Sequence, residues 1–186
     1  MAKSREAVYN ELLALRCKRG DREAMRELVR VWERRLFYYI RRIVPGEQDA
    51  WDVLQETWVR VIGGISSLRR PASLPAWLYR TARNTAISHL RAMRSDVSFE
   101  DCAETLGDIP VDEEEPFGPE DAARVHRALD AISLPHREVL TLHFLQDLSI
   151  EEIAGVVGVP AGTVKSRIHY AKRALRTALE QEEPSE

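Results

Sequence analysis

The side chains best suited to specific binding lie near the carboxyl end of the chain, on the outer side of a predicted helix. This side, which we call the recognition face, carries cations, hydroxyls, an imidazole and a phenol: Thr163, Lys165, Ser166, Arg167, His169, Tyr170 and Arg173. Cations contact phosphates, and the other groups can hydrogen-bond to base edges in a major groove wide enough to admit a helix. The pattern favours DNA binding over the alternative, a solvated helix in a small bundle.

The recognition face belongs to the second helix of a predicted helix-turn-helix. Ser149 and Glu152 have the spacing of a capping box, which begins the first helix at about residue 150. Gly158 tolerates the positive φ at which that helix must end. Residues at helical spacing form the two expected buried stripes, which are Ile150, Ile153, Ala154 and Val157 in the first helix and Val164, Ile168, Ala171 and Leu175 in the second.

A second group of cations alternates with aromatic rings in the first half of the chain. A loop rich in proline and arginine at residues 68–75 leads into a predicted helix at residues 76–94. The loop and one side of the helix carry this aromatic–cationic set: Arg69, Arg70, Trp77, Arg80, Arg83, Asn84 and Arg91. Bases of a single strand can stack on such rings while the nucleic-acid backbone follows the charges. Core aromatics with solvated arginines give the same pattern, so the residues alone leave both interpretations open.

An acidic cluster marks the predicted helix at residues 48–63. Its members are Asp49, Asp52, Gln55 and Glu56. Carboxylates near a helix N-terminus are stabilised by the helix dipole, so helix stabilisation is the simpler interpretation and a docking face for a protein partner is the alternative. The buried side of this helix is expected to contain Ala50, Leu54, Val61 and either Trp58 or Val59.

Two further helices are predicted before the acidic cluster. Residues 3–19 form the first, with apolar side chains at helical spacing: Val8, Leu12 and Leu15. Residues 21–44 form the second, which Pro45 terminates. The outer side of the second helix is rich in arginine, most simply a solvated basic surface.

No arrangement of side chains indicates catalysis or metal binding. The five histidines are scattered over different predicted helices, and the sequence has no glycine-rich phosphate loop, nucleophile elbow or metal-spaced pair. Cys17 and Cys102 are two lone cysteines, so neither a disulfide framework nor a zinc site is indicated. We therefore expect no catalytic site, no metal and no cofactor.

The charges of the 186-residue chain are unevenly distributed. The formal net charge is −3, yet residues 96–121 hold eleven acidic side chains and neither Lys nor Arg. The rest of the chain has 27 basic side chains against 19 acidic ones, a net charge of +8, which suits a polyanionic partner. Helical periodicity is lost in the acidic stretch, and its glycines and prolines predict a flexible linker.

These observations predict an all-α protein of two small helical domains joined by a flexible acidic linker. The domains span residues 1–95 and 120–180, the linker spans residues 96–119, and residues 181–186 form a tail. The second domain contains the helix-turn-helix. No apolar run approaches the roughly 18 to 20 residues that cross a bilayer, and the N-terminus lacks a signal-peptide core, so we expect a cytoplasmic protein without membrane insertion.

Three segments, taken in this order, resemble the extracytoplasmic-function (ECF) sigma factors, the small two-domain initiation subunits of bacterial RNA polymerase. The motif DAWDVLQETWVRV at residues 49–61 resembles the family's region 2.2. The motifs LRR at residues 68–70 and AWLYRTARNTA at residues 76–86 resemble regions 2.3 and 2.4. The motifs LPHREVL at residues 134–140 and GTVKSRI at residues 162–168 resemble region 4.

The resemblance implies a role for each set of residues. The acidic cluster would dock on the clamp helices of the polymerase β′ subunit. The aromatic–cationic set would open the minus-10 element and capture a flipped base of the non-template strand. The recognition face would read the minus-35 element in the major groove, and the acidic linker takes the place of the family's region 3.2.

The resemblance also implies partners, namely core RNA polymerase through its β′ and β subunits, promoter DNA, and an anti-sigma factor. Arg70, Ser88 and Tyr170 depart from residues that are frequent in the family. Because Arg70 and Tyr170 belong to promoter-reading surfaces, the promoter sequence is not carried over. Two alternatives stay open: a conventional helix-turn-helix regulator that binds duplex operators as a dimer, and a sigma-mimicking adaptor that binds an anti-sigma protein without contacting DNA.

Overall fold

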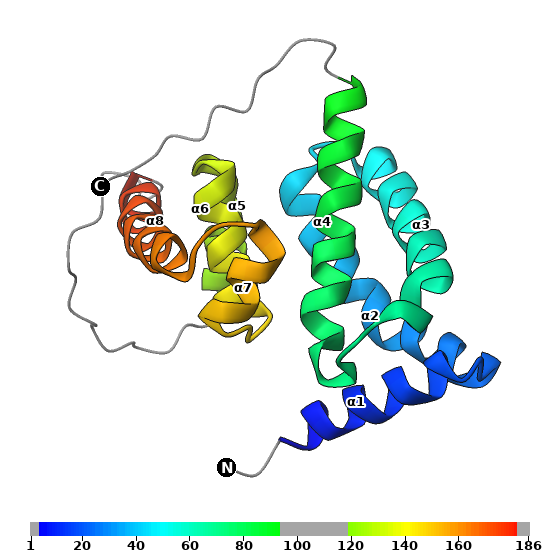
Figure 1. Cartoon of the computed structure of the whole chain (residues 1–186). Helices are drawn as coiled ribbons and strands as arrows, with labels where there is room; N and C mark the ends of the chain where they lie inside the picture. The colour runs from blue at the N-terminus through cyan, green and yellow to red at the C-terminus, as the bar shows by residue number, and fades with distance from the viewer. Residues whose placement is uncertain (1–3, 94–118, 182–186) are drawn as a thin grey trace. The chain divides into compact units, whose positions relative to one another are not determined.

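The computed structural model describes residues 4–93 and 119–181, whose helices fall into two compact units (Figure 1). The first unit contains α1 (Arg5–Lys18), α2 (Arg22–Ile43), α3 (Glu47–Gly64), two 3-10 turns (Ile65–Ser67 and Pro71–Ser73) and α4 (Leu74–Met93). The second contains α5 (Pro119–Ala131), α6 (Leu134–Leu140), a π-helical turn (Thr141–Leu145), α7 (Ile150–Val157) and α8 (Ala161–Gln181). Within the described ranges there is no strand, which confirms the predicted all-α fold. The predicted linker lies outside the described residues except for Pro119, which begins α5, and residues 182–186 of the predicted tail lie outside them too.

Local signals in the sequence determine where the first two helices begin. The Ser4 side chain caps α1 by accepting a hydrogen bond from the N–H of Ala7. At the start of α2, the Asp21 carboxylate accepts hydrogen bonds from the N–H groups of Glu23 and Ala24. These bonds satisfy N–H groups that the first turn of a helix leaves without a backbone partner.

The core of the first unit lies between α2, α3 and α4, which pack against one another. Its buried side chains are mainly large and apolar: Leu28, Trp32, Leu36, Tyr39, Ile40, Val53, Leu54, Leu74, Leu78 and Tyr79. The ring of Tyr79 meets the ring of Trp32 edge-on, with 5.9 Å between centroids, and the ring of Tyr39 in the same way at 5.3 Å. Edge-to-face contacts of this kind stabilise a core beyond the area that they bury. Burial also raises the pKa of Tyr79.

The first predicted helix, α1, is confirmed, but its apolar side chains at helical spacing face solvent. Val8, Leu12 and Leu15 are exposed. The structure buries a neighbouring stripe instead: Leu13, Ala14 and Cys17. Because α1 packs against α2 and against the two 3-10 turns, segments far along the chain select its buried side. Burial raises the pKa of the Cys17 thiol, which keeps it in its unreactive protonated form.

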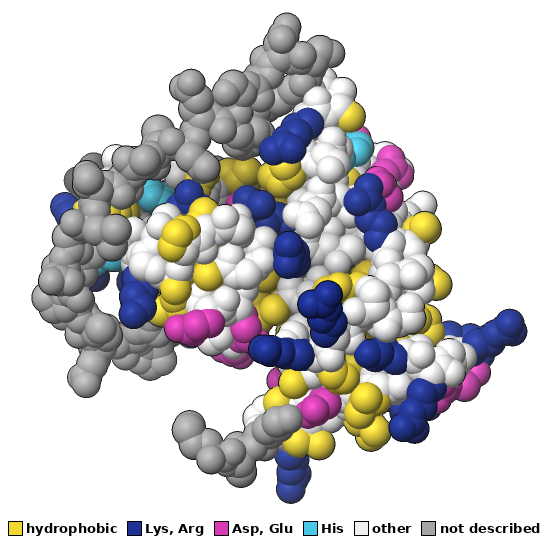
Figure 2. All heavy atoms as spheres, in the orientation of Figure 1, with side chains coloured by type: hydrophobic (Ala, Val, Ile, Leu, Met, Phe, Trp, Pro, Cys, Tyr) yellow, Lys and Arg dark blue, Asp and Glu magenta, His cyan; other side chains and the backbone are white. Residues whose placement is uncertain are grey.

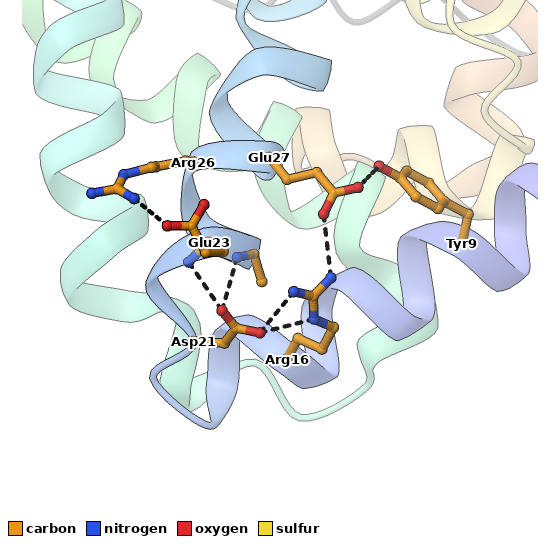
Figure 3. Close-up of polar contacts among 7 residues, drawn as sticks. Tyr9, Arg16, Asp21, Glu23, Arg26 and Glu27 are labelled. Atoms are coloured by element: carbon orange, nitrogen blue, oxygen red, sulfur yellow. Dashed lines mark hydrogen bonds and ion pairs between the residues drawn. The ribbon is translucent and has the colours of Figure 1, made fainter.

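Polar contacts fasten α1 to the start of α2 (Figure 3). The Arg16 guanidinium donates hydrogen bonds to Asp21 Oδ2 at 2.9 Å and to Glu27 Oε2 at 3.2 Å. The other carboxylate oxygen of Glu27 accepts a hydrogen bond from the Tyr9 hydroxyl at 2.5 Å. This bond to Glu27 raises the pKa of Tyr9. Two positions of α1 therefore hold one carboxylate of α2, which fixes the direction of α1.

The predicted start and end of the first helix of the helix-turn-helix, α7, are confirmed. The N–H of Glu152 donates to Ser149 Oγ at 3.3 Å, and Glu152 Oε2 accepts from the N–H of Ser149 at 2.9 Å. Gly158 has φ +76 at the end of α7, as the turn requires. Most of the two expected stripes is buried: Ile153, Val157, Val164, Ile168 and Ala171. The remaining members, Ile150, Ala154 and Leu175, are half-buried.

The second unit contains one further helix that the sequence predicts, from Pro135 to about residue 146. The structure confirms its extent in two parts, because α6 ends at Leu140 and the π-helical turn continues the helix to Leu145. The chain then turns through Asp147, which has φ +52, and the N–H of Leu148 donates to the carbonyl oxygen of Leu142 at 3.1 Å. This hydrogen bond, made across the turn, ends the helix where the sequence has no glycine or proline.

Candidate nucleic-acid interface

Three of the four members of the acidic cluster lie on the exposed side of α3. Asp52, Gln55 and Glu56 are exposed at spacings of three and four residues, which places them on one helix face. Glu56 Oε1 pairs with Arg60 one turn later, at 2.6 Å. Exposed ion pairs at this spacing contribute little to stability, so the carboxylates stay accessible to a partner.

Asp49, the fourth member of the cluster, lies elsewhere. Its side chain is half-buried, and its Oδ1 is 3.7 Å from Nε2 of His89 near the end of α4. A Cβ atom at Gly46 would lie 2.4 Å from Asp49 Oδ2, so the carboxylate lies over the start of α3. Asp49 therefore joins the start of α3 to the end of α4, which fits the helix-stabilising interpretation.

Two apolar residues extend the exposed side of α3 beyond the acidic cluster. Val59 is 70% exposed and Ile62 is 55% exposed, whereas Trp58 is only 8% exposed. Of the two residues that the sequence offered for the core, Trp58 is therefore the buried one. We call the exposed residues Asp52, Gln55, Glu56, Val59 and Ile62 the α3 face. The spacing of Val59 and Ile62 from Gln55 is the signal by which sequence reasoning could have found them.

The loop before α4 exposes two cations on an anchored backbone. Leu68 and Leu74 are buried at its ends, and Arg69 and Arg70 are exposed between them. Arg70 has an extended backbone, and its carbonyl oxygen accepts a hydrogen bond from the N–H of Ser73 at 2.9 Å. The buried leucines hold the loop while its guanidinium groups extend into solvent.

The outer side of α4 brings most of the aromatic–cationic set together. Arg80, Asn84 and Arg91 are exposed, and Arg83 is half-buried. Figure 2 shows basic side chains spaced along the surface over α4. Trp77 is half-buried, and a Cβ atom at Gly64 would lie 3.4 Å from its ring, so the indole rests against the end of α3. The ring edge and the cations together form a surface on which a single strand can bind.

The recognition face lies on α8, with one correction. Lys165 and Arg173 are exposed, and four other members are half-buried: Thr163, Arg167, His169 and Tyr170. The rings of His169 and Tyr170 meet edge-on at 5.4 Å between centroids. Ser166 was expected on this exposed side, but it is 5% exposed and its hydroxyl donates to the carbonyl oxygen of Thr163 at 3.0 Å. It lies between the buried Val164 and Ile168, on the inner edge of the helix.

Two exposed cations of α8 were missed by sequence reasoning. Lys172 and Arg176 lie seven and eleven residues after Lys165, on the same side of the helix. The Lys172 ammonium lies over the ring of Phe144, 4.8 Å from its centroid. The helical spacing from Lys165 is the signal that identifies both. The positive surface of α8 is therefore longer than predicted.

Among residues 4–93 and 119–181, no group of three or more His, Cys, Asp or Glu side chains could hold a metal ion. Over the same ranges, no helix is long and apolar enough to cross a membrane. The described residues form three charged surfaces. Those on α4 and α8 are cationic, and that on α3 is acidic and apolar.

Comparison with known proteins assigns a family to this arrangement. Models of two sigma-70 regions match the chain, region 2 at residues 28–95 and region 4 at residues 122–175. The RNA polymerase sigma-H factor of Pseudomonas aeruginosa is 35% identical over 181 residues, which cover 92% of this chain and 94% of that protein. The ECF RNA polymerase sigma-E factor of Escherichia coli is 32% identical over 181 residues, which cover 91% of this chain and 94% of that protein.

A solved structure shares the fold. It contains the sigma factor RpoE in complex with the anti-sigma factor NepR from Bartonella quintana, with a TM-score of 0.67 at 23% identity over 85% of this chain and 98% of that one. A conventional helix-turn-helix regulator would not contain the sigma-70 region 2 that residues 28–95 match, so that alternative is not favoured. The two matched regions follow one another in the predicted order, and the relatives match over nearly their whole length. The chain therefore belongs to the sigma-70 family and is an ECF sigma factor, which directs RNA polymerase to promoters in transcription initiation.

Proposed function

We propose that the α3 face docks this sigma factor on core RNA polymerase, while α4 and α8 each bind one promoter element. The proposal rests on one observation, which is that the exposed side chains of α3 differ in charge and polarity from those of α4 and α8. α3 exposes carboxylates beside apolar side chains, whereas α4 and α8 expose cations. Cations suit the phosphates of DNA, and exposed apolar side chains with charged neighbours suit a protein partner. One chain can therefore hold the polymerase and the promoter at once.

The docking partner of the α3 face is the clamp-helix region of the β′ subunit. Asp52 and Glu56 offer carboxylates to a basic surface, and Val59 and Ile62 offer apolar area that loses water on contact. The apolar pair supplies affinity, and the carboxylates select the orientation. The resemblance also implies that the chain contacts the β subunit.

The loop at residues 68–73 and the outer side of α4 bind the melted minus-10 element. Arg69 and Arg70 are exposed in the loop, and Arg80, Asn84 and Arg91 continue the polar surface along α4. Unstacking a flipped base costs free energy, and hydrogen bonds and stacking in a new site offset that cost. The loop and the Trp77 ring can provide such a site. The strand therefore follows the loop and then α4.

The exposed side of α8 reads the minus-35 element in the major groove. Lys165, His169 and Tyr170 form the base-reading group, because their spacing places them on one side of the helix. Arg167 lies toward one flank of this group and Arg173 lies one turn beyond His169, and we assign both to the phosphates that border the groove. Thr163, in the first turn of α8, contacts the phosphate backbone, as helix N-termini commonly do.

Regulation and location follow from the same role. We infer that an anti-sigma factor binds this chain, which the complex of the Bartonella quintana sigma factor supports. The chain acts in the cytoplasm, where polymerase and promoters lie. It performs no chemistry of its own, because the polymerase it directs forms the RNA bonds.

Reconstitution with core polymerase tests the proposal. Transcription of genomic DNA by the reconstituted holoenzyme, followed by sequencing of transcript 5′ ends, should reveal start sites that share minus-10 and minus-35 motifs. The free chain should bind the same promoters weakly, because its acidic stretch offsets its basic surfaces. Transcripts without a shared motif, or tight and specific DNA binding by the free chain, would contradict the proposal.

A further inference from the structure

The last turn of α1 contacts the loop proposed to bind the minus-10 strand. The Lys18 ammonium donates a hydrogen bond to the carbonyl oxygen of Leu68 at 2.5 Å, across fifty residues of sequence. Both 3-10 turns that flank Leu68 pack against α1. α1 precedes the segment matched by the region 2 model, which begins at residue 28. The family match therefore assigns no task to this contact.

The contact from Lys18 fixes the backbone at Leu68, where the loop begins. The N–H of Leu68 donates to the carbonyl oxygen of Ile65, and its carbonyl oxygen accepts from Lys18, so both of its backbone polar groups are bonded. The peptide bond to Arg69 is planar, so a fixed Leu68 carbonyl also fixes the direction of the Arg69 N–H. The bond from Lys18 is made to the last buried residue before the two exposed arginines. It therefore sets the direction in which the loop leaves the core.

α1 is a firm base for this contact. Leu13, Ala14 and Cys17 bury its inner side, and Arg16, two residues before Lys18, is bonded to α2 through Asp21 (Figure 3). When a long side chain forms a hydrogen bond, less conformational freedom is lost if its backbone is already fixed in a helix than if the backbone is mobile. A bond from a charged donor in a partly buried site is also stronger than one between neutral groups.

We propose that Lys18 is a positioning residue for promoter melting, which holds the loop at residues 68–73 in the conformation that binds the minus-10 strand. This inference rests on the strand-binding role proposed for the loop. Lys18 itself does not touch DNA. It acts by keeping Arg69 and Arg70 in a prepared arrangement, so that strand binding need not order the loop.

Three variants of the full chain separate this role from loss of charge or of stability. Lys18→Met keeps the apolar stem and removes the donor, and Lys18→Arg restores a charged donor. Arg19→Met removes a charge from the neighbouring exposed residue and serves as the matched control. Hydrogen exchange of the free chain reports on the loop, and binding of a single-stranded minus-10 oligonucleotide by the holoenzyme reports on function. The oligonucleotide is taken from a promoter mapped with the unmodified holoenzyme.

We expect Lys18→Met to speed exchange at the hydrogen-bonded amides of Leu68, Ser73 and Leu74. It should weaken binding of the oligonucleotide by about tenfold, the effect of losing one charge-assisted hydrogen bond. Exchange in the cores of α2 and α4 should not change. Lys18→Arg should restore most of both properties, and Arg19→Met should alter neither. If Lys18→Met fails to fold, Lys18→Gln, which is too short to span the same distance, replaces it.

The other outcomes overturn the inference in distinguishable ways. Unchanged exchange in the loop shows that Lys18 does not hold it. Exchange that rises equally throughout the first unit shows a general structural role. Faster loop exchange with normal strand binding, while Arg69→Gln and Arg70→Gln weaken that binding, removes the role of Lys18 but leaves the proposed function intact. If none of these variants affects strand binding, the strand-binding role of the loop itself is wrong.

Discussion

Glu56 and Val59 lie three residues apart on the same exposed side of α3, so a carboxylate and an uncovered apolar side chain share one surface. Water solvates the carboxylate well, whereas covering the exposed isopropyl group of Val59 with a partner lowers the free energy, because apolar surface is removed from water. Exposed apolar side chains are common singly. Here Ile62 continues the surface at helical spacing, so the α3 face combines charge with apolar area, which supports the proposed docking role.

The first prediction concerns this α3 face. Ile62→Ser should weaken binding to core polymerase by about 1 kcal/mol, or roughly fivefold in Kd, because it removes apolar area that the complex buries. Asp52→Lys combined with Glu56→Lys should weaken binding further, because like charges would then face a basic surface. Both variants should fold normally, since the replaced side chains are exposed. Titration of fluorescent sigma variants with core polymerase measures the effect.

Leu12→Ser is the matched control for Ile62→Ser. Leu12 on α1 is 55% exposed, as Ile62 is, but it does not belong to the α3 face. Its replacement should leave the affinity for core polymerase unchanged. Equal loss of affinity in the two variants, or none in either, would show that the α3 face is not the docking surface.

The second prediction separates melting from duplex recognition. Asn84 is exposed on α4 beside the cations, where its amide can hydrogen-bond to an extruded base. Asn84→Ala should slow open-complex formation on a duplex promoter by about tenfold, the effect of losing one good base contact. It should matter less on a promoter with a pre-melted minus-10 region. Permanganate footprinting over time measures the opening of the duplex promoter, and the rate of transcript formation is compared on both templates.

Ser88→Ala is the control for Asn84→Ala. Ser88 is exposed one turn further along α4, and its replacement also removes a small polar group. It should open the duplex promoter at the normal rate. Equal impairment of Asn84→Ala on duplex and pre-melted templates would refute its role in melting.

The helix boundaries that the sequence predicted well are those with local causes. A capping box or a glycine at positive φ acts within a few residues, so Ser149 and Gly158 locate the ends of α7 without reference to the rest of the chain. The change from α-helix to π-helix after Leu140 has no such signal, and it falls inside the helix predicted from Pro135 to about residue 146. The capping and glycine patterns report where a helix ends, so they could not predict a change of helix type within it.

The residues that face inward were harder to predict than the helices themselves. Leu12 and Leu13 are equally apolar, and the contact of α1 with distant turns decides that Leu13 is buried. Ser166 is buried although its neighbours in the pattern are polar, because helix packing admits a small side chain there. The contact of Lys18 with Leu68 joins residues far apart in sequence, so no spacing rule could show it.

The third prediction uses two glycines of the helix-turn-helix. Gly158 has φ +76, which an L side chain adopts only with strain, so Gly158→Ala should destabilise the second unit by about 1 kcal/mol. Gly155 lies inside α7, with nothing within 4 Å of an added Cβ atom, so Gly155→Ala should stabilise it by about 0.5 to 1 kcal/mol. Hydrogen exchange of amides in α7 and α8 measures both. Effects of the same sign would contradict the assigned turn.

The fourth prediction concerns pH and the start of α2. The N–H of Ala24 and the Arg16 guanidinium hold the pKa of Asp21 below its ordinary value. The unfolded chain therefore binds this proton more readily than the folded one. The stabilisation is fully present above the unfolded pKa of about 3.9 and is lost as the pH falls through the lower folded pKa. The melting temperature of the wild type should therefore fall in part through this group as the pH drops below about 4.

Asp21→Asn tests this assignment, because asparagine still caps a helix but does not titrate. Its melting temperature should depend less on pH in the acid range than that of the wild type. All four tryptophans of the chain lie in the first unit, so tryptophan emission follows the unfolding of that unit. Identical pH profiles for the two proteins would show that Asp21 does not contribute.

The last prediction concerns the division of work on α8. If Tyr170 faces bases and Arg173 faces phosphates, Tyr170→Arg should change the preferred minus-35 sequence, since arginine pairs with guanine where tyrosine cannot. Arg173→Ala should weaken binding to all sequences alike and lower the salt slope by about 1, because one phosphate contact is lost. Arg127→Ala, which removes an exposed cation from α5, is the control for loss of charge. Selection of minus-35 elements from a randomised library with each reconstituted holoenzyme, followed by a salt titration on the selected site, measures both effects. The division is wrong if Arg173→Ala alters the selected motif while Tyr170→Arg does not.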